Sequence, residues 1–227
     1  MPTVSFDAQV NGKAHRFQFN HTNDSEAIIK EIFSDNYKVI DRKVEFRPGD
    51  FVLDLGANEG MFSVFIGTVF PQVKIIALEP VPRTYFQLVN NLELNGVKNV
   101  IPLNIGVGKP GQGRVMINVS KDFSGGSTSL CTYNPDHHER IEVGMVPLDD
   151  IFEMYRIGRC RLLKIDIEGM EYDALYNSTV LDRVDYFAGE FHMNAKLDYQ
   201  GRRADGLITW VSNQTDILHV NIIKMAE

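Results

Sequence analysis

The segment Phe51-Val52-Leu53-Asp54-Leu55-Gly56-Ala57-Asn58-Glu59-Gly60 decides how this chain folds. An apolar run with one aspartate leads into a glycine-containing turn, and an apolar helical pattern begins at Met61. This order predicts a buried strand that delivers a tight loop to a helix N-terminus, where α/β sheets commonly hold nucleotide-like ligands. Gly56 lets backbone approach a ligand closely, Asn58 tolerates a left-handed turn, and Gly60 lets the helix pack tightly on the strand.

The acidic residue of this segment indicates the kind of ligand. The loop is not G-x-G-x-x-G, and Asp54 stands two residues before its first glycine. A carboxylate there suits a ligand with a cationic amino group better than a bare pyrophosphate, which favours S-adenosylmethionine. We therefore expect the cofactor to be bound by a set of residues from this segment: Asp54, Gly56, Ala57, Asn58 and Gly60.

A second acidic residue follows the next apolar run, Ile75-Ile76-Ala77-Leu78-Glu79-Pro80. Glu79 lies about 20 residues past the glycine loop, where a carboxylate accepts hydrogen bonds from both ribose hydroxyls. The alternative is that Glu79 only caps the following helix. Pro80 turns the chain away from the sheet, and Asn104, at the end of the third expected strand, is a candidate adenine contact or a turn residue.

Bulk properties restrict the class of protein. The chain has 227 residues, 44% of them hydrophobic, and a formal net charge of −7, so one compact unit is expected and a general nucleic-acid binder is not. No apolar run approaches the ~20 residues of a membrane span, and no signal peptide is apparent. Cys131 and Cys160 lack metal-binding spacing and are interpreted as reduced thiols. We expect a cytoplasmic protein without nucleic-acid or membrane partners.

Strand and helix patterns alternate from Phe51 onward, which predicts a Rossmann-like α/β fold with a mostly parallel sheet and helices on both faces. Residues 1–50 are expected to form a hairpin around Asn11-Gly12 and a short helix that caps the domain 51–227. The expected later elements are strands at 51–55, 74–78, 100–105, 114–119, 140–146, 162–167, 186–191 and 217–223, and helices near 60–70, 82–94, 170–176 and 204–212. The last strand is expected to be an antiparallel edge strand.

A second polar group follows the fourth main strand, in Lys164-Ile165-Asp166-Ile167-Glu168-Gly169-Met170-Glu171. Three acids and a lysine would be costly if they were buried without partners, so we expect them to cluster at the carboxyl edge of the sheet. The next strand ends in Gly189-Glu190-Phe191-His192. Alternation places Glu190 and His192 on one side of that strand.

With these stretches in view, the chain resembles the FkbM-type S-adenosylmethionine-dependent methyltransferases. The resemblance covers about residues 50–192 in the expected order, and the Lys-x-Asp-x-Glu-Gly-x-Glu run is its most specific piece. The other matching stretches are Val52–Gly60, Ala77–Pro80, Asn90–Asn95, Gly125–Leu130, Val146–Asp150 and Glu190–His192. The N-terminal hairpin and the last 35 or so residues match nothing diagnostic.

The resemblance implies a class I methyltransferase fold and O-methylation of a hydroxyl on a small molecule such as a sugar or natural product. Some related small-molecule methyltransferases use a divalent metal to hold the acceptor oxygen, and Asp166, Glu190 and His192 carry donors suited to Mg²⁺. The same three residues are our candidate catalytic residues, with His192 as a general base, or they form a polar network without direct chemistry. Asp166 is also a cofactor candidate, and Ser127 is a candidate contact for the methionine carboxylate.

Two other functions remain open at this point. A dehydrogenase that uses NAD would also need a ribose-binding acid. The pyrophosphate of NAD, however, prefers a glycine where Asn58 stands and is not stabilised by the negative charge of Asp54. A non-catalytic module could retain the cofactor fold. The acidic cluster argues against that function, because unused buried carboxylates destabilise a protein.

Overall fold

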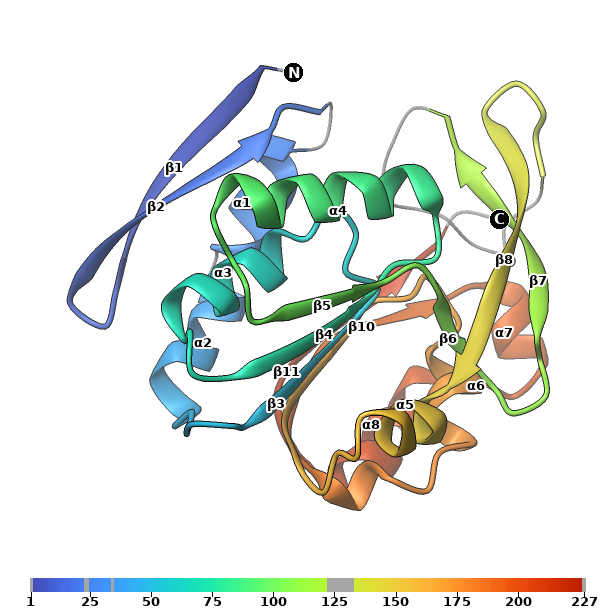
Figure 1. Ribbon diagram of the computed structural model, residues 1–227. Helices are drawn as coiled ribbons and strands as arrows, with labels where there is room; N and C mark the ends of the chain where they lie inside the picture. The colour runs from blue at the N-terminus through green and yellow to red at the C-terminus, as the bar shows by residue number, and fades with distance from the viewer. Residues whose placement is uncertain (1, 23–24, 34, 122–132, 226–227) are drawn as a thin grey trace.

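The computed structural model describes residues 2–22, 25–33, 35–121 and 133–225 (Figure 1). In chain order its elements are β1 Thr3–Val10, β2 Lys13–Asn20, α1 Ser25–Ile32, α2 Asp35–Lys43, β3 Phe51–Leu55, α3 Met61–Val69, β4 Lys74–Leu78, α4 Pro82–Leu94, β5 Val100–Leu103, β6 Gly106–Gly108, β7 Arg114–Ser120, β8 His138–Pro147, α5 Leu148–Met154, β9 Cys160–Ile165, α6 Glu171–Tyr176, a 3-10 turn Leu181–Arg183, β10 Val184–Met193, α7 Ala195–Tyr199, α8 Ala204–Ser212 and β11 Asp216–Lys224. The predicted α/β fold with an N-terminal hairpin is confirmed.

Six strands form the central sheet, in the order β11-β10-β9-β3-β4-β5. Every neighbouring pair in it is parallel, including β10 with β11, where Tyr186 pairs with Asp216. The expectation of an antiparallel edge strand is therefore wrong. The reason is the connection: the chain passes through α7 and α8 after β10, and such a helical crossover returns the next strand in the same direction.

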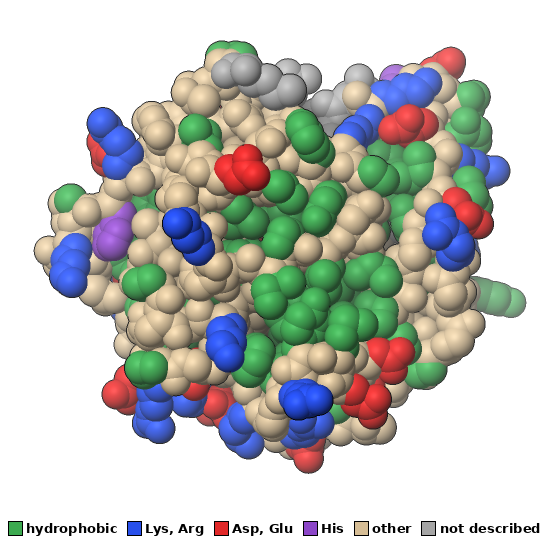
Figure 2. Space-filling model, in the orientation of Figure 1, with side chains coloured by type: hydrophobic (Ala, Val, Ile, Leu, Met, Phe, Trp, Pro, Cys, Tyr) green, Lys and Arg blue, Asp and Glu red, His purple; other side chains and the backbone are tan. Residues whose placement is uncertain are grey.

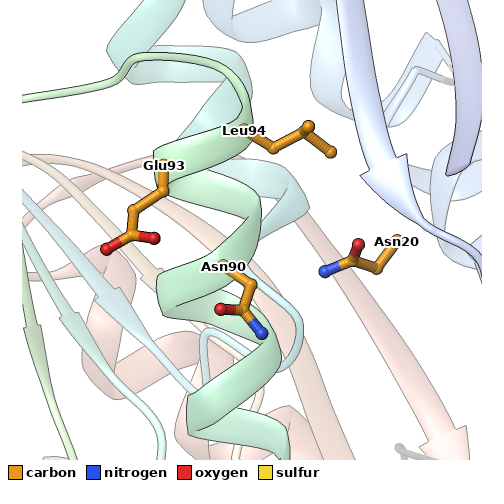
Figure 3. Close-up of a pocket in the computed structure, with 4 residues that line it drawn as sticks. All are labelled: Asn20, Asn90, Glu93 and Leu94. Atoms are coloured by element: carbon orange, nitrogen blue, oxygen red, sulfur yellow. The ribbon is translucent and has the colours of Figure 1, made fainter. Parts of the chain in front are cut away.

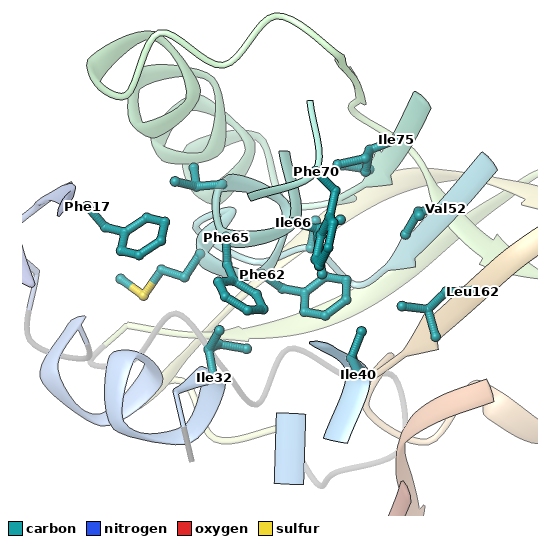
Figure 4. Close-up of a cluster of buried hydrophobic side chains, with 14 of the residues drawn as sticks. Phe17, Ile32, Ile40, Val52, Phe62, Phe65, Ile66, Phe70, Ile75 and Leu162 are labelled. Atoms are coloured by element: carbon teal, nitrogen blue, oxygen red, sulfur yellow. The ribbon is translucent and has the colours of Figure 1, made fainter. Parts of the chain in front are cut away.

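The two faces of this sheet bury separate hydrophobic clusters. On one face, side chains of β3, β4 and β9 pack with α1, α2, α3, α4 and the N-terminal hairpin, and Phe17, Phe62 and Phe65 lie among them (Figure 4). On the other face, alternate side chains of the same strands, such as Leu53 and Leu163, pack with α5, α6, α7 and α8. Successive residues of a strand point to opposite faces of the sheet. A polar residue that stands between two strand residues of the second cluster therefore points toward the first cluster.

The N-terminal hairpin forms as predicted. Asn11 and Gly12 both have positive φ, 51° and 73°, which is the backbone of the two-residue turn that suits the twist of paired strands. Phe17 and Phe19 of β2 are fully buried against the first cluster. The N-terminal hairpin therefore shares a hydrophobic core with the sheet.

The segment between β5 and β9 forms a small sheet of its own, in the order β6-β8-β7. The strand expected over 100–105 ends at Leu103 as β5, and a separate strand β6 follows at Gly106–Gly108. The helices α2, α5 and α7 were not expected. On the face shown in Figure 2, basic and acidic side chains are interspersed around hydrophobic areas that lie over the edge strand β5. Among the described residues, no helix is long and apolar enough to cross a membrane.

Candidate active site

The order of strands defines a crevice at the carboxyl edge of the sheet. From β3 the chain proceeds to β4 and β5 on one side and later to β9, β10 and β11 on the other. The point where the strand order reverses is where open α/β sheets bind their ligands. The glycine loop 56–60 follows β3 there, and the polar run 164–171 extends from the end of β9 beside it.

The backbone of the glycine loop takes the left-handed conformations that the sequence predicts. Gly56, Asn58 and Gly60 have φ of 77°, 50° and 82°. A Cβ on Gly56 would lie 1.8 Å from the carbonyl oxygen of Asp166, so the absence of a side chain lets the loop pack on the end of β9. A Cβ on Gly60 would lie 2.3 Å from Leu88 Cδ1, so Gly60 allows close packing against α4. The sequence had predicted close packing against the strand instead.

Asp54 is fully buried beneath this loop. It lies opposite Lys164 in the register of β3 and β9, on the face that packs against α3. Its Oδ2 accepts a 2.7 Å hydrogen bond from Ser63 of α3, and its Oδ1 lies 3.4 Å from Lys164 Nζ. Lys164 also donates a 2.8 Å hydrogen bond to the carbonyl oxygen of Gly56. The buried charge pair thus supports the glycine loop from below.

Glu79 directly follows β4, next to the loop, and is 6% exposed. Its Oε2 accepts a 3.0 Å hydrogen bond from the backbone N–H of Asn58, and its Oε1 accepts one of 2.9 Å from Val81. Burial raises the pKa of Glu79 to about 7, although both N–H donors and Lys164 oppose that shift. The carboxylate therefore links the end of β4 to the centre of the loop.

Two other predicted cofactor residues, Asn104 and Ala57, bond to the backbone at the end of β4. Asn104 is exposed, and its Nδ2 donates to the carbonyl oxygens of Glu79 and Pro80 at 2.9 and 3.0 Å. Ala57 is buried, and its N–H donates to Leu78 at 2.8 Å. Ser127 lies outside the described residues.

His192 is the centre of the second polar group. It is 3% exposed, and its Nδ1 lies 2.9 Å from Oε1 of Glu171, which is fully buried. Its Nε2 lies 3.4 Å from Glu168 Oε2 and 3.9 Å from Asp166 Oδ1. Burial opposes protonation, but the bond to Glu171 and the charges of Glu171, Glu168 and Asp166 outweigh it and raise the pKa of His192 to about 9. The predicted clustering of these acids is observed.

Three of these side chains offer the donor atoms of a metal site. One donor atom each from Asp166, Glu168 and His192 lies within 4.8 Å of the others. Two carboxylates and an imidazole suit Mg²⁺, Mn²⁺ or a similar ion. The group differs from the predicted one, because Glu168 takes the place of Glu190. Glu190, on β10, instead accepts a 3.1 Å hydrogen bond from Asn221 of β11.

A comparison with protein families decides what kind of domain carries this site. A model described as the methyltransferase FkbM domain matches residues 54–217, from the buried aspartate of β3 to the start of β11. The chain belongs to the FkbM methyltransferase family. The family predicted from the sequence is confirmed, and with it the methyltransferase class of the domain.

Relatives of this FkbM domain carry methyltransferase names. Methyltransferase 1 of Beauveria bassiana (strain ARSEF 2860) is 31% identical over 169 residues, which are 66% of this chain and 66% of that protein. The 31-O-demethyl-FK506 methyltransferase FkbM of Streptomyces tacrolimicus is 30% identical over 178 residues, 66% of this chain and 68% of that protein. The match thus spans just under two thirds of the length of the first relative.

One solved structure, M. jannaschii TYW2 in complex with AdoMet, is 23% identical and covers 44% of this chain and 42% of that one, with a TM-score of 0.29. A TM-score this low does not establish a common fold.

Three acidic residues of this FkbM domain were not among the predicted site residues. Glu168 and Glu171 belong to the polar run that was identified. They face His192 because Glu168 has a φ of 54° and because α6 starts at Glu171. Glu31 of α1 is the third: burial, followed by the charges of Glu190 and Asp166, raises its pKa to about 7. No signal in its own segment marks Glu31, because its neighbours in the cluster come from distant strands.

Proposed function

We propose that the chain binds S-adenosylmethionine at the glycine loop and transfers its methyl group to a hydroxyl of a small molecule. The observation that carries this proposal is the hydrogen bond from the Asn58 N–H to Glu79, which joins the loop at the switch point to the acid of the next strand. The name of one relative, 31-O-demethyl-FK506 methyltransferase, describes transfer to an oxygen and supports a hydroxyl acceptor, as in a sugar or natural product.

The residues at the loop fit such a cofactor. Each oxygen of Glu79 accepts one N–H bond, and because a carboxylate offers about four acceptor positions, capacity remains for both ribose hydroxyls. Within the described part of the chain, Oδ1 of Asn58 and Oδ1 of Asp54 are buried without a hydrogen-bond donor. Asp54 faces Lys164 and Ser63, so we infer that it acts on the cofactor amine from beneath the loop. Asn104 and Pro80 would border the adenine.

The acceptor would lie against the cluster around His192. S-adenosylmethionine supplies a methyl group already activated on a sulfonium, so the chain must align a hydroxyl, exclude water and accept its proton. The side chains of Asp166 and Glu168 are 28% and 25% exposed and are open to a bound acceptor, whereas that of His192 is 4% exposed. We infer that a carboxylate takes the proton and that His192 positions it. Glu190 lies two residues before His192 on β10.

A divalent cation fits the same cluster. Asp166, Glu168 and Nε2 of His192 would hold it, and Glu171 on Nδ1 supplies the hydrogen bond that fixes the tautomer of a metal-binding histidine. Such an ion would lower the pKa of the acceptor hydroxyl. The proton on His192 and the ion would compete for one nitrogen atom.

Calorimetry with S-adenosylhomocysteine, the demethylated product, tests the proposal. The wild-type chain should bind it, NAD should not compete, and Glu79→Gln should weaken binding. Transfer is then assayed as release of S-adenosylhomocysteine with a panel of hydroxyl-bearing acceptors. Binding of NAD in its place would restore the oxidoreductase alternative, and binding without transfer to any acceptor would favour a non-catalytic module.

A further inference from the structure

The N-terminal hairpin is attached to α4 by side-chain amides. These amides hydrogen-bond to the backbone of β2, where a third strand could otherwise pair. Asn95 accepts a 2.9 Å hydrogen bond from the N–H of Gln18 and donates one of 2.6 Å to its carbonyl oxygen. Asn91, one helical turn earlier, accepts a 2.9 Å bond from the N–H of Asn20. Beside this joint, Asn20 faces α4 across a groove lined by Asn90, Glu93 and Leu94 (Figure 3).

One of these two amides also holds the glycine loop. Nδ2 of Asn91 donates a 2.8 Å hydrogen bond to the carbonyl oxygen of Glu59, which lies between Asn58 and Gly60. Asn91 is fully buried and Glu59 is 3% exposed, so water cannot replace this bond in the folded chain. Asn95 shares the attachment to the hairpin, but it bonds to Gln18 and to the backbone of Asn91 and not to the loop.

A second bond connects the same loop residue to the N-terminal region. The hydroxyl of Thr22, just after β2, donates a 3.1 Å hydrogen bond to Oε2 of Glu59. The backbone and the side chain of Glu59 are thus both bonded by groups that dock or belong to the hairpin. This matters for the loop because Asn58, its neighbour, is held in a left-handed conformation that costs free energy for a residue with a side chain.

We propose that Asn91 is a positioning residue that holds the glycine loop in its cofactor-binding shape and couples it to docking of the N-terminal hairpin. The inference rests on the proposed cofactor site. Asn91 belongs to the Asn90–Asn95 stretch, which the sequence singles out and which has no assigned role in methyl transfer. Because coupling between two sites is reciprocal, a bound cofactor stabilises the docked hairpin as much as the docked hairpin favours the cofactor.

The test compares Asn91→Leu with the matched control Asn95→Leu by calorimetry with S-adenosylhomocysteine. Leucine is similar in size and makes no hydrogen bond. Asn95→Leu removes two bonds to β2 and Asn91→Leu removes one, so a role in hairpin docking alone predicts the larger effect for Asn95→Leu. We expect Asn91→Leu to weaken binding about tenfold and Asn95→Leu by less than about twofold, although both lower the melting temperature.

Equal losses of affinity in the two variants, or none in Asn91→Leu, would overturn the inference. If Asn91→Leu does not fold, Thr22→Val decides the question. It removes the Thr22 hydroxyl, which bonds to Glu59 and lies 2.9 Å from Ser25 Oγ, and it should weaken binding about threefold. Unchanged affinity in Thr22→Val would then overturn the inference. If the wild-type chain does not bind S-adenosylhomocysteine, the proposed function itself is rejected. If the wild-type chain binds it and the variants bind equally well, only the role of Asn91 is rejected.

Discussion

Glu171 Oε1 lies 2.9 Å from His192 Nδ1, and both side chains are buried at the carboxyl edge of the sheet. With Glu168 and Asp166 near the other ring nitrogen, the imidazolium form is favoured and the pKa of His192 rises to about 9 from the usual 6.5. The ring thus carries a positive charge at neutral pH when no metal is bound. Because of this charge, both the stability of the protein and its affinity for a metal ion should depend on pH.

Stability in the presence of a chelator should fall as the pH rises. The folded-state pKa of His192 is raised, so its contribution is fully present below about pH 6.5 and is lost as the pH rises towards about 9. We expect the free energy of unfolding in urea to decline by a few kcal/mol across this window. His192→Gln should flatten the decline, while the same substitution at the exposed His21 should not. An unchanged slope in His192→Gln would refute the ion-pair account.

Manganese should stabilise the protein more at high pH than at low pH, because the ion and the proton compete for Nε2 of His192. We expect Mn²⁺ to raise the melting temperature at pH 8.5 and to have little effect at pH 6. Glu168→Gln removes one donor of the group and should abolish the increase, and Glu190→Gln, outside the group, should retain it. The same Mn²⁺ response in Glu168→Gln and the wild type would count against this cation site.

Affinity for S-adenosylhomocysteine should increase with pH near neutrality. The pKa of Glu79 is raised to about 7, so the carboxylate that would accept the ribose hydroxyls forms only as the pH passes that value. Calorimetry at pH 6 and pH 8 should show binding roughly tenfold tighter at the higher pH. Glu79→Gln should bind more weakly at both values and lose the dependence. A dependence that persists in this variant would point to another group.

Lys164 and Asp54 should be strongly coupled. Lys164→Met leaves the buried carboxylate of Asp54 without its cation and should destabilise the protein by about 3–5 kcal/mol. The double variant with Asp54→Asn should recover part of that loss, because it removes the unpaired charge. Urea unfolding of the four proteins measures the coupling. Strictly additive effects would show that the 3.4 Å contact has no energetic role.

The sequence predicts the sheet well, since the buried parallel strands β3, β4 and β9 are mostly apolar runs between turn residues. It also predicts that the acids of the run 164–171 gather at one edge of the sheet, because isolated buried charges are unfavourable. It selected Glu190, and not Glu168, as the partner of Asp166 and His192. The pairing of Asp54 with Lys164 was not predictable. It depends on the register of two strands that lie about a hundred residues apart in the chain, which no local pattern encodes.

Two other features depend on long-range packing in the same way. Glu31 joins the acidic cluster only because the N-terminal cap packs on the sheet face that carries Asp166 and Glu190. The direction of β11 follows from the helical connection that precedes it and not from the residues of the strand. Asn91 belongs to a stretch that was noticed, yet the partners of its side-chain amide, Asn20 and Glu59, become visible only in three dimensions.

The most direct measurement is a crystal structure of the chain with S-adenosylhomocysteine bound. It should place the ribose hydroxyls within hydrogen-bond distance of Glu79, with the sulfur directed toward Asp166 and Glu168. A ligand bound elsewhere on the sheet, or a ribose that does not touch Glu79, would contradict the proposed site.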